Sequence, residues 1–321
     1  MTTTRGSDRM RVLVPWAQLE EQMGGWPDGL QVEVYDGTGA PPEDVSDVEL
    51  YVLPYGRSVG RDLLPRMPAL RAVQSLSAGV EKVLPLIGPN VTLCNGRGLH
   101  DASAAEHGLG LILAAQRELP RWVRDQDAGR WAPEHTRSLA DSRVVLVGYG
   151  SIGAALEQRL LACEAEVVRV ASKADPGRAV HGVDELPSLL PTADIVVLTL
   201  PETPGTIGLV GAETLALLPD DALVVNIGRG RTLDTEALLA ELTTGRLRAA
   251  LDVVDPEPLP SDHPLWTSGA IVTPHVGGGA ATFYPRAERL VAEQLRRFAD
   301  GRPLLNVVSG PELPQEAAPS S

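Results

Sequence analysis

The stretch from Arg143 to Gly153 restricts the fold more than any other part of this sequence. Val144 to Val147 are four consecutive apolar residues, which predicts a strand buried on both faces. The strand runs directly into a G-x-G-x-x-G pattern at residues 148–153, and after it Leu156 and Leu160 continue an apolar repeat of four residues. The order strand, glycine turn, half-buried helix predicts a doubly wound α/β domain that binds a dinucleotide.

Each glycine of this loop has an expected physical task. Gly148 permits a tight turn, Gly150 lets backbone amides approach a pyrophosphate, and Gly153 lets the helix pack closely on the strand. The strand and helix around the loop favour this interpretation over an ordinary glycine-rich turn. The remaining loop residues are therefore also predicted to contact the cofactor: Tyr149, Ser151 and Ile152.

Composition excludes several classes of protein. A chain of 321 residues with 43% apolar residues predicts two domains with ample cores. A net charge of -14 argues against a nucleic-acid or anionic-membrane partner. No apolar run approaches the ~20 residues of a spanning helix, and residues 1–10 lack a signal-peptide core. Cys94 and Cys163 lack metal-ligand spacing, so we expect buried free thiols, no metal site and a cytoplasmic protein.

Short β-rich runs alternate with segments of helical length. They predict two parallel sheets, one formed by strands that precede a long helix in the sequence and one by strands that follow it. The helix covers residues 101–119, is capped by Asp101 or Ser103, and is followed by a polar stretch at 121–142. The strands expected before it are 11–15, 31–35, 49–53, 71–76 and 91–94, and those expected after the glycine loop are 166–171, 194–200, 222–227, 248–253 and 270–273. Helices are expected at 184–190, 212–218 and 234–242.

The pattern changes after Thr273. A last helix is expected over 280–299, closed by Gly301 and Pro303. Because no further strand and helix alternation follows, this end is expected to pack on the N-terminal domain and make that domain discontinuous. Residues 1–9 are expected to be loose and residues 309–321 to be disordered.

Three polar groups of residues follow strands of the second domain, where ligands of doubly wound sheets gather. Arg229 is flanked by glycines and has room to present its planar fork to a carboxylate. Glu257 lies between two prolines that exclude a helix, so we expect its carboxylate to be directed at a partner. His275 precedes three glycines and suits proton transfer near neutral pH. A turn arginine and a solvated acidic loop are the alternatives for the first two.

Other histidines are interpreted as structural. They are His100, His107, His135, His181 and His263.

Four segments, taken in order, resemble the D-isomer-specific 2-hydroxyacid dehydrogenases over nearly the whole chain. Besides the glycine loop they are residues 200–206, 225–230, 252–258 and 273–275. The resemblance implies a Rossmann NAD(P)-binding domain, residues 101–276, inserted into a discontinuous flavodoxin-like substrate-binding domain, residues 1–100 and 277–321. Both domains are then doubly wound parallel sheets of the α/β class.

The resemblance also implies the roles of the reacting groups. Arg229 would bind the substrate carboxylate and carbonyl, His275 would transfer the proton, and Glu257 would orient the imidazole and favour its protonated form. Ala78 and Gly79 would hold the substrate carboxylate through backbone amides, and Tyr55 would cover the substrate or serve as a structural loop residue. The cofactor would contact Asp252 through its carboxamide and would lie along a groove lined by Leu200, Pro201, Thr206, Ile227 and Gly277.

The end of the second strand departs from the usual NAD pattern. An acidic residue that would accept the ribose 2'-hydroxyl is missing, and Ala171 occupies its place. Ser172 and Lys173 follow and suit a 2'-phosphate, so we predict a preference for NADP, with NAD as the alternative if Asp175 reaches the ribose.

The function that this implies is interconversion of a small 2-oxo acid and its D-2-hydroxy acid, close to the glyoxylate and hydroxypyruvate reductases. Phosphoglycerate or phosphite oxidation is an alternative within the enzyme class. A dinucleotide-sensing corepressor-type protein is an alternative outside it. A homodimer and closure of the domains, with residues 101–119 and the chain near Gly277 as hinges, are further expectations from the resemblance.

Overall fold

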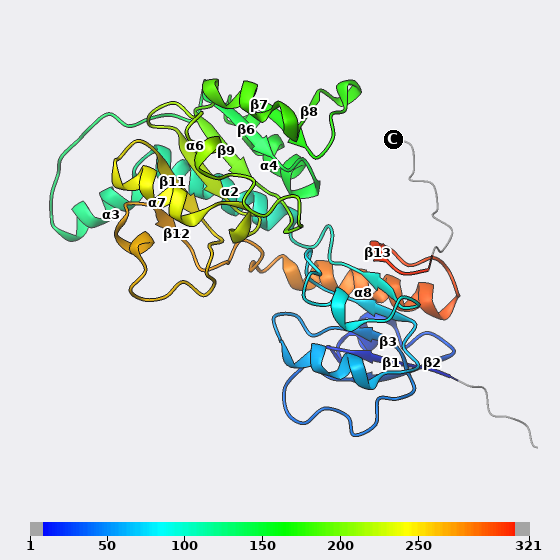
Figure 1. Ribbon diagram of the computed structural model, residues 1–321. Coiled ribbons are helices and arrows are strands. Elements are labelled where there is room, and N and C mark those ends of the chain that lie inside the picture. The colour runs from blue at the N-terminus through cyan, green and yellow to red at the C-terminus, as the bar shows by residue number, and fades with distance from the viewer. Residues whose placement is uncertain (1–8, 312–321) are drawn as a thin grey trace, which may run out of the picture. The chain divides into compact units, whose positions relative to one another are not determined.

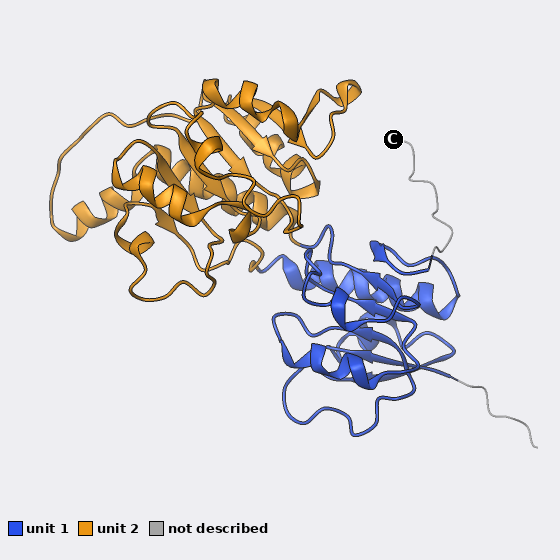
Figure 2. Cartoon of the chain, in the orientation of Figure 1, with its two compact units in different colours: residues 1–99, 281–321 blue, residues 100–280 orange. Residues whose placement is uncertain are grey.

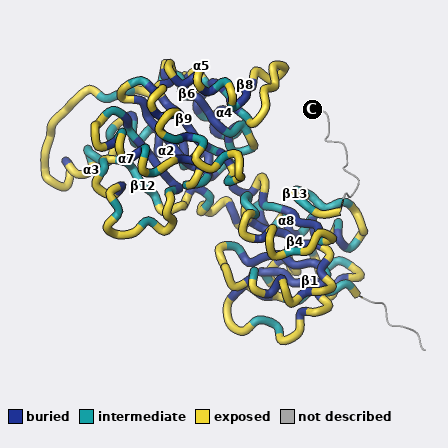
Figure 3. Tube along the Cα trace, in the orientation of Figure 1, coloured by how far each residue is buried: buried dark blue, intermediate teal, exposed yellow. Residues whose placement is uncertain are grey.

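A computed structural model describes residues 9–311 and divides the chain into two compact units (Figure 1, Figure 2). Unit 1 consists of residues 1–99 and 281–321, and unit 2 of residues 100–280. Both units are α/β structures in which the central strands of each sheet are deeply buried, while edge strands such as β2 (Leu30–Val34), β12 (Ile271–Val272) and β13 (Val307–Ser309) are more exposed (Figure 3). The expected fold class, with one parallel-sheet domain inserted into another, is confirmed.

Unit 1 contains a six-stranded sheet in the order β13-β5-β4-β3-β1-β2. Five strands are parallel, and β13 joins antiparallel to β5. The strands are β1 (Met10–Val14), β2 (Leu30–Val34), β3 (Val48–Val52), β4 (Ala72–Gln74), β5 (Thr92–Cys94) and β13 (Val307–Ser309). The helical elements are α1 (Leu19–Met23), η1 (Val59–Arg66), η2 (Leu84–Leu86) and α8 (Phe283–Ala299).

Helix α8 belongs to unit 1 because its apolar face completes that core. Phe283, Ala287, Val291 and Leu295 recur every four residues and pack against the β1–β3–β4 side of the sheet. The helix is followed by Gly301, whose φ of +65° is a conformation that glycine adopts without strain. Unit 1 is therefore built from both ends of the chain.

Unit 2 contains a seven-stranded parallel sheet in the order β12-β11-β10-β9-β6-β7-β8. The strands are β6 (Arg143–Val147), β7 (Glu166–Ala171), β8 (Val180–Gly182), β9 (Ile195–Leu198), β10 (Leu223–Asn226), β11 (Arg248–Leu251) and β12 (Ile271–Val272). The chain leaves β6 toward β7 and later returns to β9 on its other side, which makes a topological switch point at the carboxyl end of β6.

Helices cover both faces of this sheet. One core joins the sheet to α2 (Asp101–Gln116) and α4 (Ser151–Ala162), and the other joins it to α5 (Leu186–Leu189), α6 (Ala212–Leu215) and α7 (Thr235–Thr243). Single-turn 3-10 segments lie at η3 (Pro176–Arg178), η4 (Val183–Glu185), η5 (Leu190–Thr192), η6 (Gly230–Thr232) and η7 (Pro264–Thr267). Within residues 9–311, no helix is long and apolar enough to cross a membrane.

The helix expected over 101–119 is two helices. Helix α2 ends at Gln116, Glu118 adopts a left-handed φ of 51°, and Pro120 lies in the first turn of α3 (Leu119–Asp127). A proline is tolerated there because first-turn amides have no acceptor within the helix. The expected cap is also wrong: the N-cap is His100, and the Ser103 hydroxyl donates to the His100 carbonyl at 3.0 Å.

Other differences concern short elements. Strands β8 and β13, at the edges of the two sheets, were not expected. The predicted disordered tail starts too early, since Ser309 ends β13, and residues 312–321 lie outside the described part of the chain, as do residues 1–8. Cys94 is buried as expected, whereas Cys163 is only half-buried.

Candidate active site

The predicted site residues of unit 2 follow the carboxyl ends of adjacent parallel strands. The glycine loop follows β6, Pro201 follows β9, Arg229 follows β10, Asp252 follows β11, and His275 follows β12. Strand β10 pairs in register with β9 and β11, so that Asn226 faces Leu198 and Leu251. Because parallel strands end at the same edge, these segments gather where doubly wound sheets bind ligands.

The glycine loop has the shape that its spacing predicts. Gly148 has φ +109°, and a Cβ there would lie 2.8 Å from the backbone of Thr199. A Cβ on Gly153 would lie 2.6 Å from the Gly148 carbonyl oxygen, so that helix α4 could not approach the loop as it does. A Cβ on Gly150 would meet no atom within 4 Å, and α4 begins at Ser151 without a side-chain cap. The open space at Gly150 and the uncapped helix start fit the pyrophosphate of a dinucleotide.

Tyr149 is held beside the end of β7 by main-chain and side-chain contacts. Its amide donates to the Val170 carbonyl at 3.0 Å, and its hydroxyl donates to the buried Glu157 carboxylate at 2.5 Å. Burial and this carboxylate raise the pKa of Tyr149, so the phenol keeps its proton. The guanidinium groups of Arg169 and Arg178 lie 5.4 and 5.8 Å from the Tyr149 ring centroid.

The residues predicted to replace the NAD-type acidic group lie in this region. Ala171 is half-buried at the end of β7, and Ser172 and Lys173 follow it in an exposed loop. Arg178 was not predicted as a site residue, because it comes seven residues after the strand and no spacing rule points to it. The loop that brings it back is closed by paired backbone bonds between Asp175 and Val180, at 2.8 and 3.0 Å.

The predicted cofactor groove has two kinds of residue. Leu200 and Ile227 are buried in the cores of unit 2, whereas Pro201 is exposed. The Thr206 hydroxyl donates to the Pro201 carbonyl at 2.7 Å, which closes the turn after Pro201. The exposed Pro201 and the half-buried Thr206 therefore have surface available for a ligand, while the two apolar residues support the loop from below.

The loop that carries Arg229 is fixed by its neighbours. A Cβ on Gly228 would lie 2.7 Å from the Leu200 amide nitrogen, and a Cβ on Gly230 would lie 2.0 Å from the Val254 carbonyl oxygen. The buried Asn226 accepts a hydrogen bond from the Gly228 amide and donates one to the Arg229 carbonyl, both at 3.0 Å. The loop therefore packs closely between the segments that follow β9 and β11. Arg229 is half-buried there.

Glu257 and His275 come together although 18 residues separate them. The Glu257 Oε1 lies 2.5 Å from the His275 Nδ1, and the two side chains are 41% and 45% exposed. The contact occupies Nδ1 and leaves Nε2 as the second functional nitrogen of the ring. This is the geometry of a carboxylate that orients an acid/base histidine.

The turn around His275 is fixed by Asp252. His275 has a left-handed φ of 53°, and its amide donates to the Asp252 carbonyl at 2.8 Å. The Asp252 carboxylate accepts the amides of Val276 and Gly277, each at 2.9 Å, and the residue is 2% exposed. Asp252 was expected to contact a nicotinamide carboxamide. In the described structure it binds the turn that carries His275, and Gly277 is buried against it, while the contact with the carboxamide stays a prediction.

The predicted substrate residues of unit 1 follow β3 and β4. The Tyr55 ring lies 4.0 Å from the Phe283 ring, centroid to centroid, and burial raises the pKa of its hydroxyl. Ala78 and Gly79 are half-buried, and the Asn95 side chain donates to the Ala78 carbonyl at 2.9 Å. Tyr55 therefore has a structural contact in addition to the predicted cover over the substrate.

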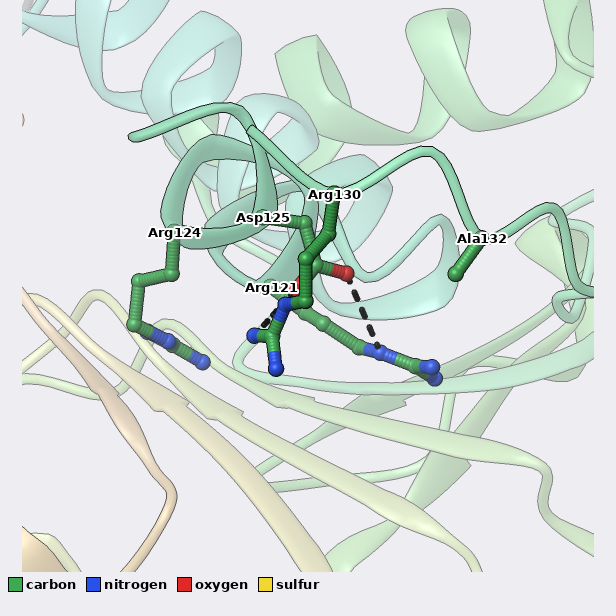
Figure 4. Close-up of a pocket in the computed structure, with 5 residues that line it drawn as sticks. All are labelled: Arg121, Arg124, Asp125, Arg130 and Ala132. Carbon is green, nitrogen blue, oxygen red and sulfur yellow. Dashed lines mark hydrogen bonds and ion pairs between the residues drawn. The ribbon is translucent and has the colours of Figure 1, made fainter. Parts of the chain in front are cut away.

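A separate pocket is formed by α3 and the segment that follows it (Figure 4). It is lined by Arg121, Arg124, Asp125, Arg130 and Ala132. Asp125 pairs with Arg130 and Arg121, and Arg121 also pairs with Glu118 and Glu134. Most of its charge is thus neutralised by the chain itself. Across the described range, no group of three or more potential metal ligands occurs.

Comparison with known proteins gives a consistent result. The family model for the NAD binding domain of D-isomer specific 2-hydroxyacid dehydrogenases matches residues 109–277. The D-3-phosphoglycerate dehydrogenase of Methanocaldococcus jannaschii is 30% identical over 298 residues, covering 88% of this chain and 57% of the relative. The enzyme of that name from Mycobacterium bovis is 32% identical over 315 residues, covering 91% and 58%. This chain therefore spans somewhat over half the length of these relatives.

Solved structures of similar proteins match the full fold. A D-isomer specific 2-hydroxyacid dehydrogenase from Xanthobacter autotrophicus Py2, in complex with NADPH and MES, has a TM-score of 0.78 and 31% identity, covering 94% of this chain and 98% of that one. An NADPH-dependent glyoxylate/hydroxypyruvate reductase from Sinorhizobium meliloti, in complex with NADP and sulfate, has a TM-score of 0.79 and 26% identity, covering 93% and 98%. With the strand-end geometry described above, these matches show that the chain belongs to the D-isomer-specific 2-hydroxyacid dehydrogenase family.

Proposed function

We propose that this protein is an NAD(P)-dependent oxidoreductase that interconverts a 2-oxo acid and the corresponding D-2-hydroxy acid. The observation that carries the proposal is the His275–Glu257 pair at the edge of the sheet where Arg229 and the glycine loop also lie. The similar proteins described above are dehydrogenases and reductases, which gives the corepressor-type alternative no support.

Arg229, His275 and Glu257 have different roles in the proposed reaction. The Arg229 guanidinium binds the substrate carboxylate and adds positive charge where the carbonyl oxygen becomes an alkoxide. Protonated His275 gives the Nε2 proton to that oxygen during reduction and takes it back from the hydroxyl during oxidation. Glu257 holds Nδ1 and stabilises the charged ring. The nicotinamide, when bound, supplies or accepts the hydride.

For the substrate we propose a small 2-oxo acid such as glyoxylate or hydroxypyruvate. Similarity to the Sinorhizobium reductase supports this choice, whereas similarity to the phosphoglycerate dehydrogenases supports a phosphorylated 2-hydroxy acid. A phosphate would require basic groups near the loops of unit 1, where Arg57 and Arg97 are candidates. We assign selection of the substrate side chain to the loops of unit 1, and binding of the cofactor and of the substrate carboxylate by Arg229 to unit 2.

The test is oxidation of reduced cofactor in the presence of glyoxylate, hydroxypyruvate, pyruvate, phenylpyruvate and bulkier 2-oxo acids. Reverse assays with D-3-phosphoglycerate and phosphite cover the alternatives. We expect the highest kcat/KM with glyoxylate or hydroxypyruvate. Absence of turnover with every compound would leave the fold assignment standing and would refute the proposed activity.

We further propose a preference for NADP. An uncharged Ala171, the Ser172 hydroxyl and the Lys173 ammonium favour a 2'-phosphate, and Arg178 adds a cation beside Tyr149. Comparison of kcat/KM for NADPH and NADH measures the preference. A higher value with NADH would overturn it.

A homodimer formed through unit 2 is proposed as the assembly. Residues 126–135 are all exposed, they have no regular structure from 130 to 135, and Trp131 is 96% exposed. Leu119 and Val123 add exposed apolar surface on one face of α3. Trp131→Glu should lower the mass measured by light scattering to that of one chain, while wild-type protein at the same concentration shows twice that mass. A wild-type protein of single-chain mass would refute the dimer.

We also propose a cytoplasmic location. Cys94 and Cys163 are free thiols, and thiols stay reduced in the cytoplasm.

A further inference from the structure

His107 on helix α2 makes two polar contacts at the edge of the sheet. Its Nε2 lies 3.0 Å from the Thr273 hydroxyl and 3.1 Å from the Asp252 Oδ1. The next residue, Gly108, is packed so closely that a Cβ there would lie 2.8 Å from the Ile227 side chain. Helix α2 therefore packs closely on the strand ends. This packing places His107 beside the segment that carries His275.

Asp252 links His107 to that segment. Its carboxylate accepts hydrogen bonds from the Thr273 hydroxyl at 2.6 Å and from the amides of Val276 and Gly277. The residues on both sides of His275 are therefore bound to one buried anion, and the His107 Nε2 lies 3.1 Å from the same anion. An isolated buried carboxylate is unfavourable, so each donor supports the others.

The need for this support lies in the backbone of His275. A left-handed φ is uncommon for a residue other than glycine and persists only where the surroundings determine it. The short contact to Glu257 requires the ring to leave the turn in one direction. Loosening the turn therefore changes where Nε2 points, even though every reacting group is still present.

The chain passes between the units at two points, and both lie next to the elements that His107 and Asp252 connect. Residues 99–100 lead into α2, and residues 280–281 follow the turn that contains His275. Within unit 2, the His100 Nδ1 also lies 3.2 Å from the Gly278 carbonyl. His100, the N-cap of α2, thus ties the start of that helix to the end of the turn, and His107 binds the same helix to Asp252 and Thr273.

We propose that His107 is a positioning residue, which acts on His275 through Asp252 and Thr273 and does not touch the substrate. This inference rests on the proposed function for its kinetic consequence. Its structural consequence, the fixed orientation and tautomer of the His275 ring, is independent of any activity.

The experiment compares His107→Ala and His107→Gln with His181→Ala. Gln can donate from its own Nε2, and Ala cannot. His181 is a matched control, since its Nδ1 pairs with Glu185 at 2.8 Å in the same unit and lies far from β12 in the sheet. All four proteins, including the wild type, are compared by thermal unfolding.

Kinetics supply the first measurement. We expect His107→Ala to lower kcat by about 10- to 100-fold, as other supporting partners of functional groups do, with the Kd for NADPH changed less than about threefold. His107→Gln should recover most of the loss, and His181→Ala should behave as the wild type. Retention of kcat within about twofold by His107→Ala would overturn the proposal.

Nitrogen NMR of isotope-labelled histidine supplies the second measurement, without cofactor or substrate. In the wild type, the neutral His275 ring should carry its proton on Nδ1, which donates to Glu257. His107→Ala should give a mixture of tautomers. An unchanged tautomer, or a loss of kcat that only follows a lowered Tm in all three variants, would overturn the proposal. If the wild type shows no turnover, the proposed function fails while the NMR result still decides the role of His107.

Discussion

The strand-end loops of the two units are stabilised in different ways. In unit 2, backbone groups and a buried carboxylate hold the turn of His275, and close glycine packing holds the loop of Arg229. In unit 1, the Tyr55 ring packs against the Phe283 ring. Polar contacts of fixed geometry define position closely, whereas apolar packing tolerates exchange of side chains of similar volume.

This difference separates the chemistry from the selection of the substrate. Groups that transfer a proton or bind a carboxylate must keep their geometry, and they lie in the rigid loops of unit 2. A wall of the substrate site requires only a suitable shape. We therefore expect substitutions in unit 2 to change rates greatly and substitutions at Tyr55 to change the order of preferred substrates.

The largest effect is expected for His275→Ala. Removal of the acid/base group should lower kcat by about 10²- to 10⁴-fold and leave the Kd for NADPH nearly unchanged. Steady-state kinetics and cofactor fluorescence titration measure the two quantities. His181→Ala is the control, since this histidine lies on β8, at the other edge of the sheet from β12, and should not affect either quantity. Full turnover by His275→Ala would show that His275 is not the acid/base group, which would contradict the assignment of the chemistry to unit 2.

The next effect concerns the backbone of unit 2. Gly230→Ala places a methyl group in the Val254 carbonyl and should lower the free energy of unfolding by about 3 kcal/mol or more. Gly150→Ala meets no atom, so it should cost less than about 1 kcal/mol while weakening NADPH binding. Denaturant titration and cofactor titration check both variants. Equal stability losses would contradict the distinction between a packed loop and an open one.

A moderate effect is expected for Tyr55→Leu in unit 1. The relative kcat/KM for small and bulky 2-oxo acids should change by about tenfold, because a larger space is left beside the substrate. The Kd for NADPH should stay the same. Tyr55→Phe keeps the ring stacked on Phe283 and serves as the control for the hydroxyl. If Tyr55→Leu lowers kcat with all substrates equally, Tyr55 serves the structure of unit 1 and does not select the substrate.

The smallest effect concerns the thiols, one in each unit. Burial raises the pKa of Cys94 to about 12, so this thiol should not react with a disulfide reagent in the native protein. Cys163, half-buried at the end of α4, should react. The number of thiols titrated before and after unfolding checks this. Two reactive thiols in the native state would show that the core of unit 1 opens under these conditions.

Most of unit 2 was predictable because its signals are local. A strand, three glycines and a helix follow one another in the sequence, and Asp234 caps α7 where the apolar repeat begins. The pairing of Glu257 with His275 could be predicted only through the family resemblance, since no spacing rule connects them. Whether Arg229, Glu257 and His275 act together in catalysis stays a prediction.

The parts that sequence patterns missed depend on contacts between distant segments. His107 looked structural because an isolated histidine on a helix carries no sign of Asp252, which is 145 residues away. Pro120 was taken as the end of a helix, although the left-handed Glu118 had already ended it and the proline begins α3. Strand β13 was missed because its three residues gain their role only by pairing with β5.

The discontinuous sheet of unit 1 has a consequence for synthesis on the ribosome. The first five strands emerge early, but α8 and β13, which cover and extend that sheet, emerge only after the whole of unit 2. Until then, the side of the sheet that will contact Phe283, Val291 and Leu295 lacks the cover that α8 provides. Unit 2 is therefore synthesised in full before unit 1 is complete. During translation, the apolar strands of unit 1 that are still exposed are expected to bind chaperones.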